Sequence, residues 1–201
     1  MTDNDRPFLS PEELDMAGNS RIFELKHAIM LKVRDLLERT LLSLTETVFP
    51  LPEGITAGTA KFSKGENYRL MPYQVLDFPR FSGGGDLYLN RTVFWWGNHF
   101  SCSLTVAGQP LERIRSVLTG RLQAIAARDD MLLCVAPTPW HHDTGADNAQ
   151  PLPHLKRHEI EAIATRHPFC KLSRVLPLNR GVALPGFATE SFRLFNSLFL
   201  G

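Results

Sequence analysis

Six polar side chains in the first half of the chain have residue types that could bind and act on a small anion. They are Glu66, Tyr68, Asp77, Arg80, Arg91 and His99. An arginine can hold a carboxylate or phosphate with two parallel hydrogen bonds, and a histidine can exchange a proton near neutral pH. The pattern indicates a site in which Tyr68, Arg80 and Arg91 bind an anionic ligand and His99 is the general acid or base. Salt bridges between strand ends explain the same residues without any ligand.

A second group is rich in histidine. It consists of His141, His142 and Asp143, followed by His154 and His158. His154 and His158 would share a helix face if a helix begins by Pro153, and with one earlier histidine they could bind a metal. However, Leu155 stands where a zinc protease helix has its glutamate, and this spacing often recurs by chance. We therefore interpret these histidines as part of an exposed loop and helix start, and we predict no metal and no cofactor.

Other catalytic templates are absent from the sequence. Gly83-Gly84-Gly85-Asp86 lacks the Lys-Ser/Thr of a phosphate-binding loop, and there is no G-x-G-x-x-G, G-x-S-x-G or Cys-x-x-Cys. The cysteines, Cys102, Cys134 and Cys170, are odd in number and have apolar neighbours. They are typical of buried free thiols in a reducing compartment, which predicts a cytoplasmic protein. Whether the protein is an enzyme stays open.

Composition excludes two classes of partner. The chain has 201 residues with 22 Lys and Arg against 21 Asp and Glu, a formal net charge of +1. Because there is no basic excess or stripe, nucleic-acid binding is not expected. No apolar run approaches the ~20 residues that span a bilayer, so no membrane partner is expected.

An aromatic hairpin must position the candidate residues. The segments Arg91–Trp96 and His99–Val106 read as strands, and Gly97-Asn98 fits a two-residue turn. That turn pairs Trp96 with His99 and predicts a core face with Val93, Trp95, Phe100, Cys102 and Leu104. The opposite face would then carry Thr92, Phe94, Trp96, His99, Ser101, Ser103 and Thr105. A three-residue loop would exchange the two faces.

This opposite face suits a ligand wall or an interface, with Phe94 and Trp96 among the binding residues. The sequence thus favours a small-molecule-binding or protein-interaction module, and the alternative is an enzyme that acts on a small anionic substrate through His99. If helices cover Phe94 and Trp96, this face can serve neither as a ligand wall nor as an interface.

The N-terminal part of the chain predicts two helices. Ser10-Pro11-Glu12-Glu13 reads as a capping box that begins a short helix within a loosely ordered segment, residues 1–19. A long helix follows from Ser20 to about Val48, and its apolar surface is wider than one narrow stripe. Either it is a bent core helix or part of it packs on a second chain, which would give a homodimer through residues 20–48.

Residues 20–201 read as one α+β domain with an antiparallel sheet. Further strands are expected at Ile55–Lys64, Tyr73–Phe78, Met131–Ala136 and Phe169–Leu176. A polar turn is expected at Lys64–Asn67, and a mobile loop at Ser82–Asp86. Helices are expected after Pro110, at Leu155–Arg166 and around Phe192, Phe195 and Phe199.

Several short segments carry a resemblance to known sequences. They are Lys64-Gly65-Glu66-Asn67-Tyr68, Leu76-Asp77-Phe78-Pro79-Arg80, Phe94-Trp95-Trp96-Gly97-Asn98 and His167-Pro168-Phe169. With these segments the chain resembles an uncharacterised family of bacterial proteins of unknown function. The resemblance runs in scattered pieces from Lys61 to the C-terminus, and it implies no activity, cofactor or catalytic residue.

Overall fold

A seven-stranded antiparallel sheet forms the centre of the molecule. The computed structural model describes residues 8–200. The strands are β1 (Lys61–Tyr68), β2 (Met71–Gly83), β3 (Asp86–Trp95), β4 (His99–Ala107), β5 (Leu132–Cys134), β6 (Ala149–Pro151) and β7 (Phe169–Pro177). Their spatial order is β1-β2-β3-β4-β7-β5-β6, and every neighbouring pair is antiparallel. The α+β class with an antiparallel sheet is thus confirmed.

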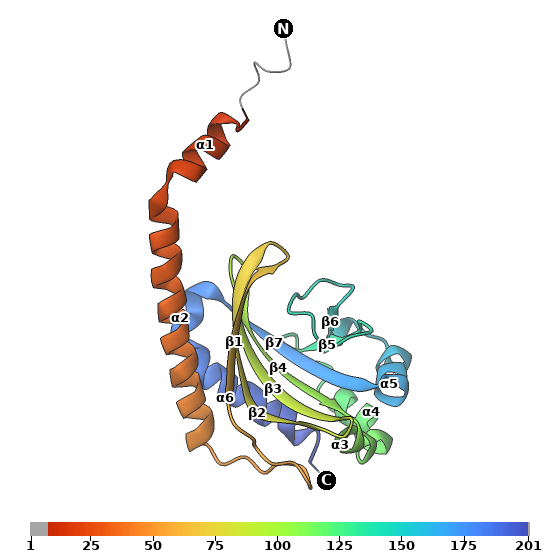
Figure 1. The fold of residues 1–201 in the computed structure, drawn as a ribbon. Coiled ribbons are helices and arrows are strands. Elements are labelled where there is room, and N and C mark those ends of the chain that lie inside the picture. Colours follow the sequence, from red (N-terminus) through yellow and green to blue (C-terminus); the bar gives the residue numbers. More distant parts are fainter. Residues whose placement is uncertain (1–7, 201) are drawn as a thin grey trace.

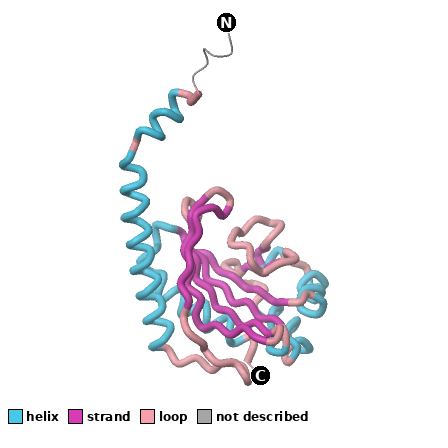
Figure 2. Tube along the Cα trace, in the orientation of Figure 1, coloured by secondary structure: helices cyan, strands magenta, loops and turns pink. Residues whose placement is uncertain are grey.

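Helices lie on both sides of this sheet. They are α1 (Pro11–Gly18), α2 (Ser20–Glu46), α3 (Gln109–Glu112), α4 (Arg115–Ala124), α5 (Arg157–Arg166) and α6 (Leu184–Ser197). Figure 1 shows α2 and α6 on one face, while β5, β6 and α5 lie toward the other. The same division between helical and strand layers is visible in Figure 2. In the described residues, no helix is long and apolar enough to cross a membrane.

The main core fills the space between the sheet and helices α2 and α6. Phe94, Phe100 and Leu104 from the hairpin meet Leu37 of α2 and Phe192 of α6 in one buried cluster. Each strand contributes alternate residues to this cluster because successive side chains point to opposite faces. The other face of the sheet is therefore left to a different set of side chains.

The hairpin register differs from the sequence prediction by one residue. Trp95, not Trp96, pairs with His99, so the connection is a three-residue loop of Trp96, Gly97 and Asn98. The predicted two-residue turn was wrong, and the one-residue shift exchanges the faces of β3 alone. Val93 and Trp95 lie on the face opposite the main core, whereas Phe100, Cys102 and Leu104 of β4 lie in that core as predicted. Phe94 is buried in the main core, and Trp96 is partly buried against it. Trp95 shares the opposite face with His99.

The turns at the two ends of β2 also differ from the prediction. The polar turn expected at Lys64–Asn67 is wrong, because these residues belong to β1. The chain reverses instead at Arg69 and Leu70, where both residues have positive φ. The mobile loop expected at Ser82–Asp86 is a tight turn, with Gly84 and Gly85 at positive φ between the paired Gly83 and Asp86. Strand β2 continues past Pro79 through an irregularity in its register.

The first two helices begin where the sequence indicates. The Ser10 hydroxyl accepts a hydrogen bond from the Glu13 backbone and the Glu13 carboxylate accepts one from the Ser10 backbone, which confirms the capping box. Asn19 alone separates α1 from α2, and its side chain caps α2 by accepting from Arg21 N–H. The C-terminal elements are confirmed in kind, although α5 begins at Arg157 and His154 lies in a preceding 3₁₀ turn. His154 and His158 therefore do not share one helix face.

Candidate functional site

The sheet face opposite α2 and α6 is unusually polar for a buried surface. We call it the polar face, and its members are Tyr73, Val75, Asp77, Arg91, Val93, Trp95, His99, Ser101, Ser103, Thr105, Lys171 and Ser173. Strand register places them in rows across four strands, for example Asp77, Arg91, Ser103 and Ser173. The segment between β5 and β6, residues 135–148, lies against this face and is called the cover loop.

Lys171 of β7 fastens the middle of the cover loop. Its side chain is buried, with 8% exposure, and its Nζ donates hydrogen bonds of 2.7 Å to the carbonyl oxygens of Pro139 and His141. Burial lowers the pKa of Lys171 to about 8. An ammonium has three donors, so these two bonds leave one N–H of the group to be satisfied otherwise.

Tyr68 and Asp143 fasten the loop at the end nearer the hairpin turn. The Tyr68 hydroxyl donates to Asp143 Oδ2 at 2.6 Å and accepts from the His142 backbone N–H at 3.0 Å. The Arg69 guanidinium lies 3.2 Å from the same carboxylate oxygen. Burial raises the pKa of Asp143, but the bonds from Tyr68 and Gly145 outweigh it, and the net pKa is lowered. Asp143 is therefore a buried carboxylate that holds the loop closed.

Two histidines, His142 of the cover loop and His99 of β4, lie close to the polar face. The His142 ring lies 4.9 Å from the Tyr68 ring and 5.1 Å from the Tyr73 ring, centroid to centroid. Burial, with the positive charges of Arg91 and Lys171, lowers the pKa of His142 to about 4. Burial also lowers the pKa of His99, against a hydrogen bond with the His142 backbone. Both rings are thus neutral at pH 7.

The Nε2 atom of His99 is buried and has no hydrogen-bond partner among the described residues. A buried polar atom without a partner costs about 1–3 kcal/mol, so such atoms are uncommon in folded proteins. A ligand or water that donates to Nε2 would remove this cost. His99 is for this reason the unsatisfied group of the polar face.

Arg91 is already engaged by a carboxylate of its own sheet. Its Nε and NH2 donate to the two Asp77 carboxylate oxygens at 2.7 and 2.9 Å, a bidentate pair across β2 and β3. The other side of the guanidinium lies 5.6 Å from the ring of Trp140 in the cover loop. Arg91 therefore both neutralises Asp77 and supports the loop.

The space left beneath the loop is small. Its volume is about 20 Å³, and it is lined by Ser101, Ser103 and Ser173 hydroxyls, by Lys171 and by cover-loop residues. This is about the space that one water needs. A ligand larger than one water can bind to the polar face only if the cover loop moves away.

The residues predicted from sequence do not converge on one point. Tyr68, Arg91 and His99 are all associated with the polar face, but Arg91 pairs with Ser103, four residues from His99, a backbone separation of roughly 13 Å. Arg80 lies past the irregularity of β2, seven residues or roughly 20 Å along the strand from Tyr73. Phe94 and Trp96 belong to the opposite face. The sheet thus keeps Tyr68 and His99 near each other and separates them from Arg80.

Sequence reasoning missed most of the polar layer. Lys171 was a recognisable signal, because it stands between the apolar Cys170 and Leu172 in a predicted strand. A lysine is rarely buried at such a position unless its ammonium group has partners. His142 and Asp143 were interpreted as incidental, and nothing local indicated that they fold over β3 and β4. Among residues 8–200, no group of three or more His, Cys, Asp or Glu side chains is arranged to hold a metal.

Comparisons of the chain with protein-family models, with curated proteins and with solved structures give no match. The resemblance to an uncharacterised bacterial family stays a prediction. Function must therefore be argued from the site alone.

Proposed function

We propose that the protein binds a small anionic molecule on the polar face, with the cover loop as its lid. The observation that carries the proposal is the buried Lys171 ammonium, which lies beside three serine hydroxyls and is closed over only by a polar loop. A sheet face that served the core alone would be covered by apolar side chains, as the opposite face is.

With the cover loop closed, Lys171 makes hydrogen bonds that an anionic ligand could replace. The Lys171 bonds go to two neutral backbone carbonyls, and an ionised ligand oxygen forms a stronger bond to an ammonium than a carbonyl does. An anion that enters would replace one carbonyl, accept from serine hydroxyls and free part of the cover loop. Hydrogen bonds from Lys171 and Tyr68 fasten the middle of the loop, while Ala136 near its start packs with Cys134 and Phe169. We therefore expect the middle of the loop to open.

Thermal unfolding in the presence of simple anions tests this function. Phosphate, sulfate, acetate and citrate are compared at matched ionic strength for the wild type and for Lys171→Met. Lys61→Met, an exposed lysine on β1, is the control. A ligand that binds only the folded state raises the midpoint, so at least one anion should stabilise the wild type and Lys61→Met but not Lys171→Met. The proposal fails if no anion stabilises the wild type, or if Lys171→Met responds equally.

A second candidate is an enzyme acting on the same class of molecule, with His99 as general acid or base. It is favoured by the buried Nε2 of His99, which has no partner, and by the lowered pKa that keeps this imidazole a neutral base at pH 7. If it is correct, His99→Asn should abolish turnover of an anionic substrate while anion binding persists. Equal loss of both would assign His99 to binding alone.

We also propose that the chain forms a homodimer through the helix at residues 20–48. The supporting observation is that α2 has no buried residue before Val33. Sedimentation velocity across the micromolar range tests it, and a single monomeric species would contradict it. The proposed cytoplasmic location is supported by three free cysteines, Cys102, Cys134 and Cys170, since free thiols persist in reducing compartments.

A further inference from the structure

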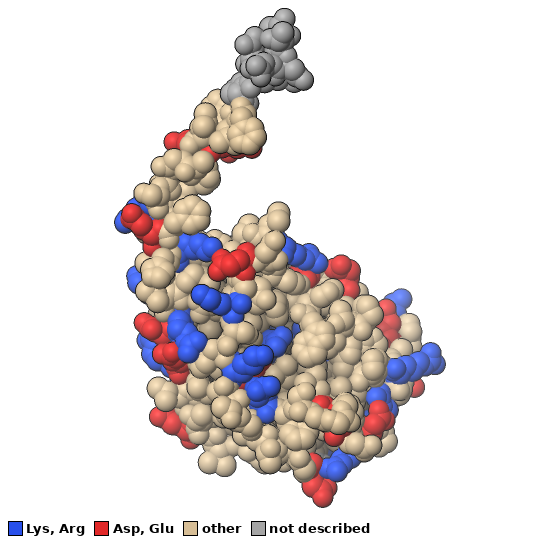
Figure 3. Space-filling view, viewed as in Figure 1, with Lys and Arg blue, Asp and Glu red and all other residues tan. Residues whose placement is uncertain are grey.

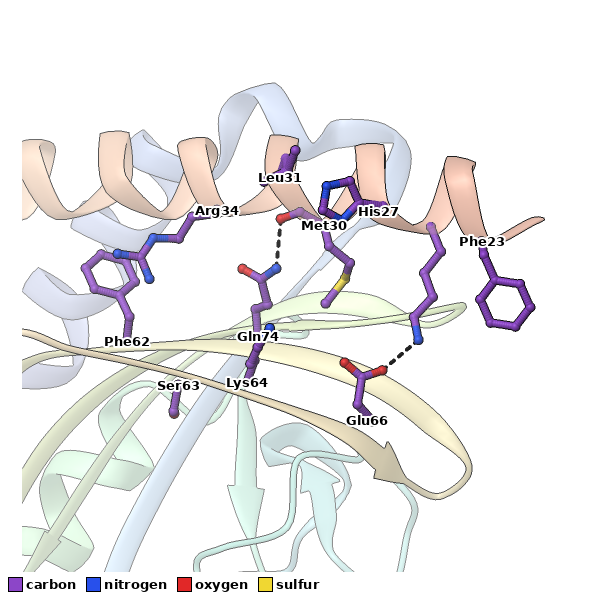
Figure 4. A pocket seen from close by; sticks show the side chains of 11 residues that line it. Phe23, His27, Met30, Leu31, Arg34, Phe62, Ser63, Lys64, Glu66 and Gln74 are labelled. Atoms are coloured by element: carbon purple, nitrogen blue, oxygen red, sulfur yellow. Dashed lines mark hydrogen bonds and ion pairs between the residues drawn. The ribbon is translucent and has the colours of Figure 1, made fainter. Parts of the chain in front are cut away.

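A groove lies between α2 and β1, and Figure 4 shows its lining residues. Its volume is about 610 Å³. Its lining residues are Phe23, Lys26, His27, Met30, Leu31, Arg34, Phe62, Ser63, Lys64, Glu66 and Gln74. Gln74 of β2 donates to the Met30 carbonyl at 2.8 Å, and Lys26 bonds Glu66 at 2.6 Å, so two bonds hold α2 at this distance from the sheet. The groove is therefore a built feature in which the apolar side chains of Phe23, Met30, Leu31 and Phe62 alternate with polar ones.

The helices that lead into this groove form an arm without a protein partner. Figure 1 shows α1 and the first turns of α2 extending beyond the body of the molecule. The large apolar side chains on this arm are between 37% and 67% exposed: Leu14, Met16, Ile22, Phe23, Leu25, Ile29 and Leu31. Isolated helices shorter than ~12–15 residues are marginal in water, so the eight-residue α1 needs a surface to pack on.

The arm cannot fill the groove of its own chain. A turn that folds one helix back along the next takes about 2–5 residues, and only Asn19 lies between α1 and α2. The groove begins at Phe23, so α1 would have to reverse within this single residue. A second molecule has no such restriction.

Charge favours α1 as the occupant. The acidic residues Glu12, Glu13 and Asp15 lie on α1, which carries no basic residue. The groove is lined by Lys26, Arg34 and Lys64; Glu66 lies 2.6 Å from Lys26 and Glu38 lies 2.6 Å from Arg34, so three cations face two carboxylates. Figure 3 shows Lys and Arg side chains gathered on the side of the molecule formed by α2 and β1. An acidic helix that presents Leu14 matches a groove with this positive excess and with apolar side chains among its lining residues.

We propose that α1 of a second copy of this chain occupies the groove, and that the two copies exchange their arms. The two arms run antiparallel, so that a two-fold axis passes near Ser20 and each groove receives the acidic helix of the other copy. About this axis residue 14 of one copy lies opposite residue 26 of the other, so Leu14 enters the groove beside Lys26, while Met16, two residues further along, lies on another side of α1. This inference deepens the homodimer proposed above and rests on it.

Sedimentation of the Leu14→Glu variant measures the dissociation constant of the dimer. It distinguishes a dimer formed by arm exchange from a dimer formed through another surface. Leu14 is 55% exposed on a helix without buried residues, so we expect the variant to keep its fold, which circular dichroism checks. Because each dimer buries two copies of Leu14, the dissociation constant should rise at least roughly 100-fold. Val117→Glu, at an apolar residue 46% exposed on α4, is the matched control and should leave the dissociation constant unchanged. Glu12→Lys with Asp15→Lys should also weaken association.

Cross-linking locates the arm directly. A protein with Leu14→Cys is mixed with a size-tagged protein with Lys64→Cys, whose position pairs with Gln74 on the side of the sheet that faces α2. A short thiol-to-thiol linker is added; the native cysteines are buried and do not react. A cross-link between the two species supports the exchange, whereas Leu14→Cys with Val117→Cys on α4 should give none. A monomeric wild type overturns the dimer and the exchange together. A dimer that tolerates Leu14→Glu and gives no cross-link overturns the exchange alone.

Discussion

The buried ammonium of Lys171 makes a quantitative prediction about stability and pH. Burial lowers its pKa to about 8 in the folded protein. In the unfolded chain the pKa of lysine is about 10.4. A difference of roughly 2.5 units corresponds to roughly 3 kcal/mol, the cost of keeping this group charged inside the folded state.

The sign follows from which state binds more protons. Between about pH 8 and pH 10.4 the unfolded chain keeps its Lys171 proton and the folded chain releases it, so this residue's contribution to stability rises with pH. The cost is fully present below about pH 8 and absent above about pH 10.4. The buried thiols Cys102 and Cys170, whose pKa burial raises to about 12, act in the opposite direction over part of this range. A difference between variants is therefore needed.

Urea unfolding of the wild type and Lys171→Met at a series of pH values isolates this contribution. The free energy of unfolding of the wild type minus that of Lys171→Met should be constant below about pH 7 and should rise by up to roughly 3 kcal/mol by about pH 10.4. Thiol ionisation is common to both proteins and cancels. Lys61→Met, whose side chain is exposed, should give a constant difference. A constant difference for Lys171→Met would refute the reasoning, because it would mean that the cover loop is open and the ammonium solvated.

Three further substitutions test other parts of the described architecture. Arg91→Met leaves the 4% exposed Asp77 carboxylate without its partner and should lower the free energy of unfolding by about 3–5 kcal/mol, with partial recovery when Asp77→Asn is added. Tyr88→Phe removes the buried hydroxyl that donates to Asn196 and should destabilise by about 1–3 kcal/mol in the same urea assay. Asp143→Ala removes the carboxylate that fastens the cover loop, and hydrogen exchange of residues 137–148 should accelerate while that of β3 does not.

Local chemistry was enough to predict the helices and the type of sheet. The Ser10 capping box acts within four residues, and the apolar spacing of α2 acts within one helix, so both could be recognised without knowing the rest of the fold. The antiparallel arrangement followed from closely spaced strands such as those of the Arg91–Val106 hairpin.

The hairpin shows where local reasoning failed. Gly97 and Asn98 fit a two-residue turn, but the sheet chose the register that buries Phe94, Phe100 and Leu104 against α2 and α6. Register depends on which face the helices cover, and that is a property of the whole domain. The mistake exchanged the faces of β3, and so assigned Phe94 and Trp96 to the wrong one, while the faces of β4 were predicted correctly.

The sequence by itself determined the N-terminal helices and the two strands of the hairpin, because capping, periodicity and strand propensity are properties of neighbouring residues. It did not determine the bounds of β1, which spans Lys61–Tyr68 and not Ile55–Lys64. Only the tertiary structure decided which side chains meet. His142 and Asp143 come from the cover loop, Tyr68 from β1 and Lys171 from β7, and the hydrogen bonds that join them span up to 75 positions of the chain. Those contacts form because a polar sheet face and a polar loop satisfy each other's hydrogen bonds when both leave water, and no local pattern encodes such a pairing.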